Sequence, residues 1–244
     1  MKYKKVLMIG GTHGNERTGV DLVLDLQNKP IAFVKPIIAN PKAVKNNTRY
    51  VETDLNRSVG HKLSVSYEEV LATSLAYKIK QAELVIEFHN TTAKNNTCAI
   101  VTTKPTNLHF LLASHFGLSK VLVMPSSGSL SGISSNKFFS LEISNSDKRF
   151  TNIKYLKQKL IDLNSINNKT IAQPLVYKFI GASVNKITLT RLGISLNKLH
   201  NFQVFSKHVT RILNLPTNRK FCPVFIGEKA YGKVFGFHIV ELIN

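Results

Sequence analysis

The stretch KVLMIGGTHGNERTGV, residues 5–20, joins a short apolar run to a glycine pair and then to a polar segment. The run at residues 5–11 is typical of a buried strand, and residues 18–29 space their apolar side chains as a helix does. A buried strand that leads directly into a helix is the repeating unit of α/β folds. This stretch therefore predicts the beginning of a layered α/β protein.

The same alternation continues along the chain and predicts a mostly parallel or mixed central sheet flanked by helices. We expect further strands at residues 32–41, 83–90, 98–103, 121–126 and 138–144, and helices at residues 67–82, 106–117 and 152–165. After a polar stretch near residue 168 the pattern changes to short β-like segments at residues 174–181, 185–193, 222–227 and 234–243. The sequence thus predicts an α/β domain over residues 1–168 and a small β-rich domain over residues 169–244.

The composition is that of a globular protein with its own hydrophobic core, since 43% of the residues are hydrophobic and 19% are charged. No run approaches the roughly 20 apolar residues of a membrane span. The basic N-terminus is followed by an apolar run that ends at Gly10, too early for a secretory signal. Cys98 and Cys222 are far apart and lack the spacing of a thiolate metal site. We therefore expect a cytoplasmic location without a membrane partner.

The net charge of +19 must attract anions. The lysines are scattered singly, and the sequence contains neither an RNP-like aromatic motif nor a Cys/His finger spacing, which disfavours a direct nucleic-acid function. Two interpretations stay open. The charge is either a lysine-rich surface or a basic funnel that concentrates a small acidic substrate.

Three polar segments follow or end expected strands. The first contains His13 and Glu16, the second is EFHN with His89, and the third is LEIS with Glu142. By itself the H-x-x-E spacing is weak evidence for a metal site, because a histidine near a glycine loop is more often part of a hydrogen-bonded turn, and the segment lacks the spacing of a phosphate-binding loop. Because functional groups collect at the carboxyl ends of strands, two imidazoles and one carboxylate there indicate a candidate zinc site with a fourth position left for water.

A polar loop at residues 40–57 carries Arg49, Asp54, Asn56 and Arg57. Guanidinium groups bind carboxylates in a fork geometry and polarise carbonyl groups, so such a loop is suited to an acidic ligand. The alternative is an exposed loop with incidental arginines.

Four segments, in this order along the chain, resemble the aspartoacylase and succinylglutamate desuccinylase family of zinc-carboxypeptidase-like enzymes. They are GGTHGNERTGV at residues 10–20, NPKAV followed by TRYVETDLNR within residues 40–57, FHNTT at residues 88–92 and CPVFIGEKAY at residues 222–231. HNTT, and PVF followed by E-x-A-Y, are more similar to the aspartoacylase branch than to the desuccinylases. The resemblance implies a mixed central sheet of the zinc-carboxypeptidase type.

The resemblance also implies one zinc ion per subunit, bound by His13, Glu16 and His89. A zinc-bound imidazole usually donates its second N–H to a carboxylate or carbonyl group. Asp54 and Glu87 are therefore candidates for that contact, with a local turn and a solvent-facing strand residue as the alternatives.

For the reaction, the resemblance implies that Glu142 is the general base and acid and that Arg49 faces the scissile carbonyl. Asn56, Arg57 and Tyr231 would contact the carboxylates of the substrate. The implied activity is the hydrolysis of N-acyl amino acids, with N-acetyl-L-aspartate, which gives acetate and aspartate, as the expected substrate.

Several alternatives remain from the sequence. They are succinylglutamate-type deacylation, deacylation of apolar N-acyl amino acids, C-terminal peptide trimming, and a non-catalytic relative that binds zinc or an anion. The expected partner is a small acidic N-acyl amino acid, and a homo-oligomer stays open.

Departures from the family pattern bear on the substrate. Gly132 stands where the family places an arginine for the side-chain carboxylate of the substrate, and Lys137 is the nearby cation that could replace it. Ala182 replaces a substrate-binding lysine, and Ser144 replaces a glycine two residues after Glu142. These departures leave hydrolysis intact and leave the identity of the amino acid open.

Overall fold

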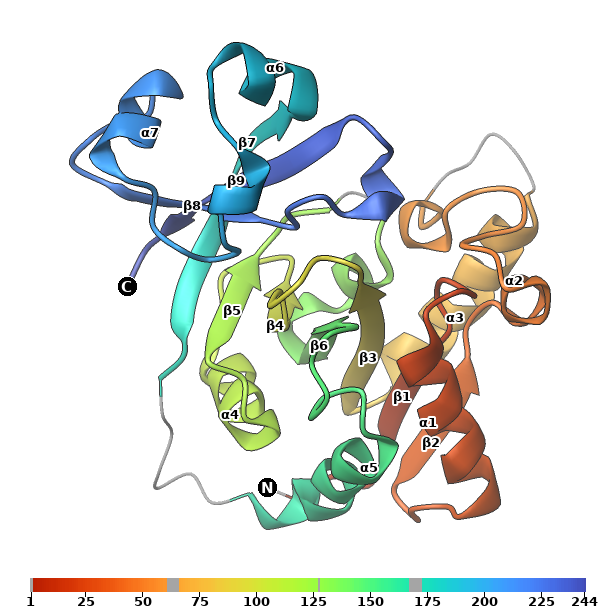
Figure 1. The fold of residues 1–244 in the computed structure, drawn as a ribbon. Coiled ribbons are helices and arrows are strands. Elements are labelled where there is room, and N and C mark those ends of the chain that lie inside the picture. Colours follow the sequence, from red (N-terminus) through yellow and green to blue (C-terminus); the bar gives the residue numbers. More distant parts are fainter. Residues whose placement is uncertain (1, 61–65, 127, 167–172) are drawn as a thin grey trace.

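The structure is a computed structural model that describes residues 2–60, 66–126, 128–166 and 173–244. Strands of the described residues join in one nine-stranded sheet with the order β2-β1-β3-β6-β4-β5-β7-β9-β8 (Figure 1). Their bounds are β1 Val6–Gly10, β2 Val34–Ile38, β3 Leu84–Thr91, β4 Cys98–Val101, β5 Lys120–Val123, β6 Phe138–Ser144, β7 Leu175–Asn185, β8 Lys220–Val224 and β9 Phe235–Leu242.

The α-helices are α1 Arg17–Asn28, α2 Pro41–Asn46, α3 Tyr67–Gln81, α4 Asn107–Phe116, α5 Ile153–Ile161, α6 Lys186–Arg191 and α7 Lys207–Ile212. Short 3-10 helices are η1 Leu55–Arg57, η2 Leu130–Ile133, η3 Ser135–Lys137, η4 Asp162–Ser165, η5 Leu196–Lys198 and η6 Lys229–Tyr231. No helix in the described ranges is long and apolar enough to cross a membrane.

The sheet is mixed, as the alternation of elements predicted. Strands β2, β1, β3 and β6 pair in parallel. Strand β4 pairs antiparallel with β6, and β5 then pairs in parallel with both β4 and β7. Both edge strands contain a proline, Pro36 in β2 and Pro223 in β8, which is tolerated because an edge strand leaves one side unpaired. The carboxyl ends of β1, β3 and β6 therefore lie at the same end of the sheet.

Helices cover both faces of the sheet. Helices α1, α4 and α5 lie on one face (Figure 1). Their apolar residues pack there with Phe88 and Phe116, which are among the largest buried side chains. Ala72, Leu75 and Ile79 of α3 cover the other face at β1 and β3. Further along this second face, apolar residues from the C-terminal part of the chain pack against β4 and β5. Side chains that alternate along β3 and β6 therefore face either a closed core or the space between α3 and the C-terminal part.

The C-terminal strands extend the central sheet. Strand β7 pairs in parallel with β5, β9 pairs antiparallel with β7, and β8 pairs antiparallel with β9. The predicted domain boundary near residue 168 lies outside the described residues, so the division into residues 1–168 and 169–244 stays a prediction. The fold class, a mixed α/β sheet of the predicted kind with β-rich additions at the C-terminus, is confirmed.

One predicted strand is wrong. Residues 185–193 contain β-branched side chains that favour a strand, yet most of them form helix α6. The side chain of Asn185 accepts the N–H of Thr188 at 2.7 Å and caps this helix, and Leu189 is buried against the C-terminal sheet. Capping and tertiary burial outweigh the local β propensity here.

Candidate metal and substrate site

The loop after β1 is shaped by two glycines. Gly11 has φ +68°, a left-handed conformation that disfavours larger residues. A Cβ atom at Gly14 would lie about 2.0 Å from the backbone carbon of Ala43, so only glycine allows the loop to approach α2 this closely. The two glycines therefore fix the path of the segment that carries His13 and Glu16.

Glu16 is the N-cap residue of α1, but its side chain makes no capping hydrogen bond. Asn90, at the end of β3, supplies an acceptor instead: its Oδ1 accepts the N–H of Thr18 at 3.0 Å. A helix start normally needs such an acceptor for its free N–H groups. Because Asn90 provides one, the Glu16 carboxylate is free to turn away from the helix and toward β3.

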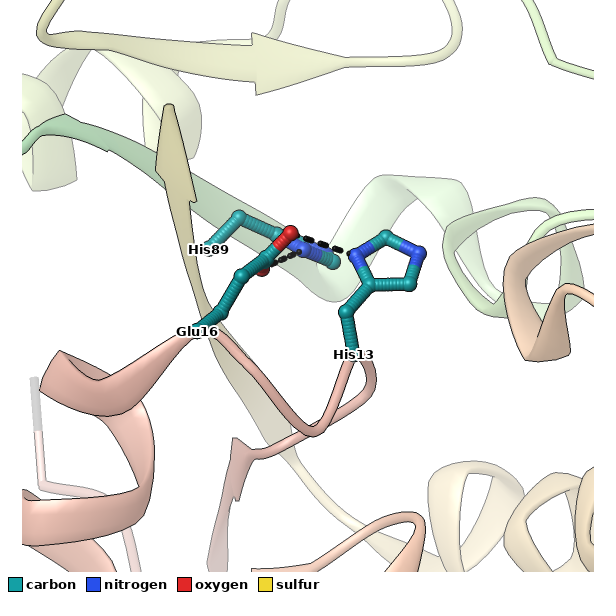
Figure 2. Close-up of side chains that lie close together, drawn as sticks. All are labelled: His13, Glu16 and His89. Atoms are coloured by element: carbon teal, nitrogen blue, oxygen red, sulfur yellow. Dashed lines mark hydrogen bonds and ion pairs between the residues drawn. The ribbon is translucent and has the colours of Figure 1, made fainter. Parts of the chain in front are cut away.

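His13, Glu16 and His89 form one buried cluster (Figure 2). The Nδ1 atom of His13 lies 2.6 Å from Oε1 of Glu16, and the Nδ1 atom of His89 lies 2.9 Å from Oε2. The two imidazole rings come from elements far apart in sequence, yet their centroids are only 5.2 Å apart. Glu16 therefore contacts both histidines with its two oxygens.

The electrostatics of the cluster are dominated by this shared carboxylate. Burial by itself would lower the pKa of His13, but Glu16 and Asp54 together outweigh burial and the pKa lies above its usual value. The pKa of His89 is raised further, because Glu87 and Glu16 both oppose the effect of burial. Conversely, the two imidazoles hold the pKa of Glu16 well below its usual value although the group is buried. The carboxylate is thus ionised and stabilises positive charge beside it.

The three side chains fit a zinc ion by their donor chemistry and by their spacing. One ligand atom from each of His13, Glu16 and His89 can be chosen such that all lie within 4.8 Å of one another. Two imidazoles and one carboxylate are a donor set of catalytic zinc sites, in which the remaining position is kept for water or substrate. The cluster could therefore hold a divalent ion with the ligands predicted from the sequence.

Each histidine also faces a second carboxylate. The Nε2 atom of His13 lies 3.1 Å from Oδ1 of Asp54, and the Nε2 atom of His89 lies 3.1 Å from Oε2 of Glu87, although the latter contact lacks hydrogen-bond geometry. Glu87 is fully buried and accepts hydrogen bonds from Thr12 and Ser140. Glu87 is therefore not a solvent-facing residue, whereas Asp54 also makes the local turn that was its alternative, since its Oδ1 accepts the N–H of Asn56 at 2.9 Å. Both carboxylates are nevertheless placed to orient an imidazole.

Glu142 lies beside the cluster without belonging to it. It is the register partner of His89 in the parallel pair of β3 and β6, and its side chain lines the same cavity. Burial raises the pKa of Glu142 to about 8, although the His89 imidazole works against that rise. A carboxyl group of this kind can exchange a proton near neutral pH.

Arg49 reaches the cluster from the loop between α2 and η1. Its Nη1 atom lies 3.5 Å from Oε1 of Glu16, and its Nη2 atom donates to Oδ2 of Asp54 at 3.2 Å. The backbone of the same residue is tied to the first loop, since the N–H of Gly14 donates to the Arg49 carbonyl at 3.2 Å. The guanidinium group is thus held at the wall of the cavity.

The predicted substrate contacts line a single cavity of about 620 Å³ together with the cluster. Asn56 and Arg57 enter it from η1, and Tyr231 enters from η6 in the C-terminal part. Arg57 donates to the side-chain oxygen of Ser126 at 2.9 Å and has no carboxylate partner among the described residues. All eight residues predicted for metal, catalysis and substrate therefore meet in one place.

Sequence reasoning missed Glu228, whose buried carboxylate attaches the C-terminal part to the end of β3. Its oxygens accept hydrogen bonds from Thr91 and Thr92 and from the N–H of Ala93. The E-x-A-Y motif contains this glutamate three residues before Tyr231, so the signal was present. Its partner threonines, however, lie more than a hundred positions away.

The structure bears on two of the positions that concern departures from the family pattern, Ser144 and Lys137. Ser144 fits where the family has glycine, because its hydroxyl donates to the Ala93 carbonyl at 2.8 Å. Lys137 does not replace the missing cation, which corrects that interpretation: its ammonium group donates to the carbonyls of Lys80 and Ala82 at the end of α3. Lys137 is also absent from the lining of the cavity.

The mixed sheet, its covering helices and the His–Glu–His cluster at the ends of β1 and β3 define a zinc-carboxypeptidase-like α/β protein. The crystal structure of murine aminoacylase 3 has this fold, with a TM-score of 0.75 over 100% of this chain and 96% of that one, at 21% identity. Residues 2–151 match the model of the succinylglutamate desuccinylase/aspartoacylase catalytic domain. The chain belongs to this family.

Curated relatives carry two kinds of name. A probable aspartoacylase of Acaryochloris marina is 36% identical over 122 residues, which are 43% of this chain and 41% of the relative. An N-acyl-aromatic-L-amino acid amidohydrolase (carboxylate-forming) of Xenopus tropicalis is 38% identical over 110 residues, 38% of this chain and 36% of the relative. The matches thus span less than half the length of these relatives.

Proposed function

We propose that this protein is a zinc-dependent amidohydrolase that removes the acyl group from N-acyl amino acids. The observation that carries the proposal is the buried His13–Glu16–His89 cluster with Glu142 and Arg49 on the walls of the same cavity. The names of the relatives, aspartoacylase and N-acyl-amino acid amidohydrolase, support the same reaction class. One zinc ion per subunit and a cytoplasmic location stay predictions from the sequence.

His13, Glu16 and His89 would hold the zinc ion, which when bound lowers the pKa of a water molecule and polarises an acyl carbonyl. Glu142 accepts the proton of the attacking water and returns it to the leaving amine nitrogen. Arg49 donates hydrogen bonds to the carbonyl oxygen as negative charge develops there. Asp54 and Glu87 keep the two imidazoles oriented.

Arg57 is the candidate for binding the α-carboxylate of the substrate. Its guanidinium group is exposed to the cavity and is not engaged by a carboxylate of the described protein, whereas Arg49 is close to Asp54 and Glu16. Asn56 and Tyr231 line the cavity and contribute neutral hydrogen-bonding groups.

The amino-acid side chain of the substrate admits two candidates. N-acetyl-L-aspartate is the prediction from the sequence, and the exposed Lys229 at the cavity is the cation that would favour it. A neutral side chain is the second candidate, favoured by the apolar lining residues Ile100, Met124 and Phe225 and by the location of Lys137 outside the cavity. Ile100 lies on the same face of the sheet as Glu142, because it pairs with Ser140, two residues before Glu142 in β6. The neutral part of the cavity lining is therefore next to Glu142.

The test is acid release by the zinc-loaded protein from a panel of N-acetyl-aspartate, N-succinyl-glutamate, N-acetyl-methionine, N-acetyl-phenylalanine and a blocked dipeptide. Release of acetate or succinate from at least one N-acyl amino acid is the expected result. Cleavage of the dipeptide alone would point to a carboxypeptidase. Binding of zinc and of the compounds without any hydrolysis would identify a non-catalytic relative and overturn the proposal.

A further inference from the structure

Glu68 is a fully buried carboxylate outside the site described above. It is the second residue of α3, and its side chain is buried although the preceding helix cap, Ser66, is half-buried. Oε1 accepts the N–H of Val51 at 2.7 Å and Nδ2 of Asn40 at 2.9 Å. Oε2 accepts the N–H groups of Glu52 and Thr53, each at 3.2 Å.

All four partners of Glu68 are neutral donors. A buried carboxylate without a cation is costly unless several hydrogen bonds satisfy it. Burial works to raise the pKa of Glu68, but the N–H of Val51 and the other donors outweigh it, so the pKa lies below its usual value. The α3 N-terminus adds a favourable dipole. One of these charge-assisted hydrogen bonds comes from Asn40, the N-cap of α2, and the other three connect α3 to the loop at residues 51–53.

That loop carries the groups that contact the His13–Glu16 segment. Arg49 lies two residues before Val51, and Asp54 directly follows Thr53. Arg49 and Asp54 contact each other, and Asp54 contacts Nε2 of His13. Residues 51–53, whose N–H groups bind Glu68, are themselves exposed, so polar contacts hold them rather than a closed core. Besides the bonds to Glu68, Thr53 contacts the hydroxyls of Ser58 and Ser66, and Glu52 accepts the N–H of Tyr67.

We propose that Glu68 is a positioning residue: its carboxylate fixes residues 51–53 and thereby sets Arg49 and Asp54 against His13 and Glu16. The kinetic consequence rests on the proposed deacylase function, but the effect on the metal site does not. Removing the anchor lets Asp54 drift from His13 and lets Arg49 drift from the carbonyl that it is to contact. Loss of an outer partner of a metal ligand costs metal affinity as well as rate.

The variant Glu68→Gln tests this role with little change in volume. Each carboxylate oxygen accepts two hydrogen bonds, so an amide group in either orientation points its NH₂ at two donors. The cap of α3 is untouched, because Ser66 and Glu69 form it. The matched control is Glu52→Gln, which also removes one carboxylate charge but does so in the loop that Glu68 binds. Glu52 accepts one hydrogen bond, from the N–H of Tyr67, and a glutamine carbonyl can keep it.

Zinc affinity, measured by competition with a chromogenic chelator, and kcat and KM on the best N-acyl amino acid are compared for both variants. For Glu68→Gln we expect about tenfold weaker zinc binding and about tenfold lower kcat/KM, mostly through kcat, with less than about twofold change in the control. In an Asp54→Asn background, Glu68→Gln should weaken zinc binding far less, because the contact that it positions is already gone.

Equal zinc affinities of Glu68→Gln and Glu52→Gln, or fully multiplicative effects with Asp54→Asn, would overturn the positioning role. If no N-acyl amino acid is hydrolysed by the wild type, the proposed function fails, while the zinc titration still decides the role of Glu68. The shorter Glu68→Asp variant keeps the charge and serves the same measurements if Glu68→Gln does not fold.

Discussion

Glu142 lies directly opposite His89 in the parallel pairing of β6 and β3. Residues so paired are on the same face of the sheet, about 4.8 Å apart across the strands. The acid group is therefore next to the metal-ligand cluster without being one of its three members. In the proposed mechanism, this relationship would let Glu142 act on protons while another carboxylate, Glu16, would bind the metal.

Replacing His89 with alanine should abolish zinc retention and turnover together, because the imidazole is one of only three candidate donors from the cluster. Zinc content after gel filtration, measured beside acid release, checks this. His208→Ala, on the exposed face of α7, is the control and should keep both. A His89→Ala protein that retains one zinc per chain would show that the ligands lie elsewhere.

Replacing Glu142 with alanine should leave zinc binding unchanged and lower kcat by at least about 100-fold, because the group transfers protons rather than binding metal. Parallel zinc titration and steady-state kinetics separate these effects. The isosteric Glu142→Gln variant should behave alike, since an amide cannot accept the proton. Full activity in both variants would remove Glu142 from the mechanism.

Substituting Arg57 with lysine should raise KM about tenfold and change kcat little, since lysine keeps the charge but cannot form a two-point contact with a carboxylate. The comparison uses one N-acyl amino acid and, as control, Arg211→Lys in exposed α7. An unchanged KM would mean that the α-carboxylate is bound by another group, with Lys229 as the next candidate.

Met124→Lys should shift the preference toward acidic substrates, because it places a cation in the neutral part of the cavity lining. The ratio of kcat/KM for N-acetyl-aspartate over N-acetyl-methionine should increase at least about tenfold. Met124→Leu keeps the wall neutral and should leave the ratio near the wild-type value. If the wild type already strongly prefers N-acetyl-aspartate, the neutral-side-chain candidate is wrong.

The stability of the protein should fall between pH 6.5 and pH 4 partly through His238. Burial lowers the pKa of His238 from 6.5 to about 4, and aromatic rings of Phe179, Phe225, Tyr231 and Phe235 surround it. In this window the unfolded chain binds a proton at His238 that the folded protein does not, so acid favours unfolding.

The melting temperature of the His238→Gln variant should therefore fall less between pH 7 and pH 5 than that of the wild type. Thermal unfolding followed by circular dichroism at the two pH values measures the difference. The exposed His200 provides the control variant His200→Gln, which should keep the wild-type pH dependence. Identical pH dependence of all three proteins would contradict a depressed pKa at His238.

The sequence by itself determined the alternation of strands and helices and the chemistry at strand ends. His13, His89 and Glu142 each follow or end an apolar run that can be recognised from neighbouring residues alone. Parallel strands end at the same edge of a sheet, which brings the ends of these runs together. Their convergence was therefore predictable, and the resemblance of four segments added predicted roles for Arg49 and Tyr231.

Only the tertiary structure decided the partners of groups that are far apart in the chain. Local periodicity could not reveal that Glu68 binds the loop at residues 51–53, or that Glu228 binds Thr91. Nor could it show that the ammonium group of Lys137 donates to carbonyls at the end of α3, or that most of residues 185–193 form a helix. The physical reason is that hydrogen bonds, burial and capping depend on distances in the fold, which a one-dimensional pattern of apolar side chains does not contain.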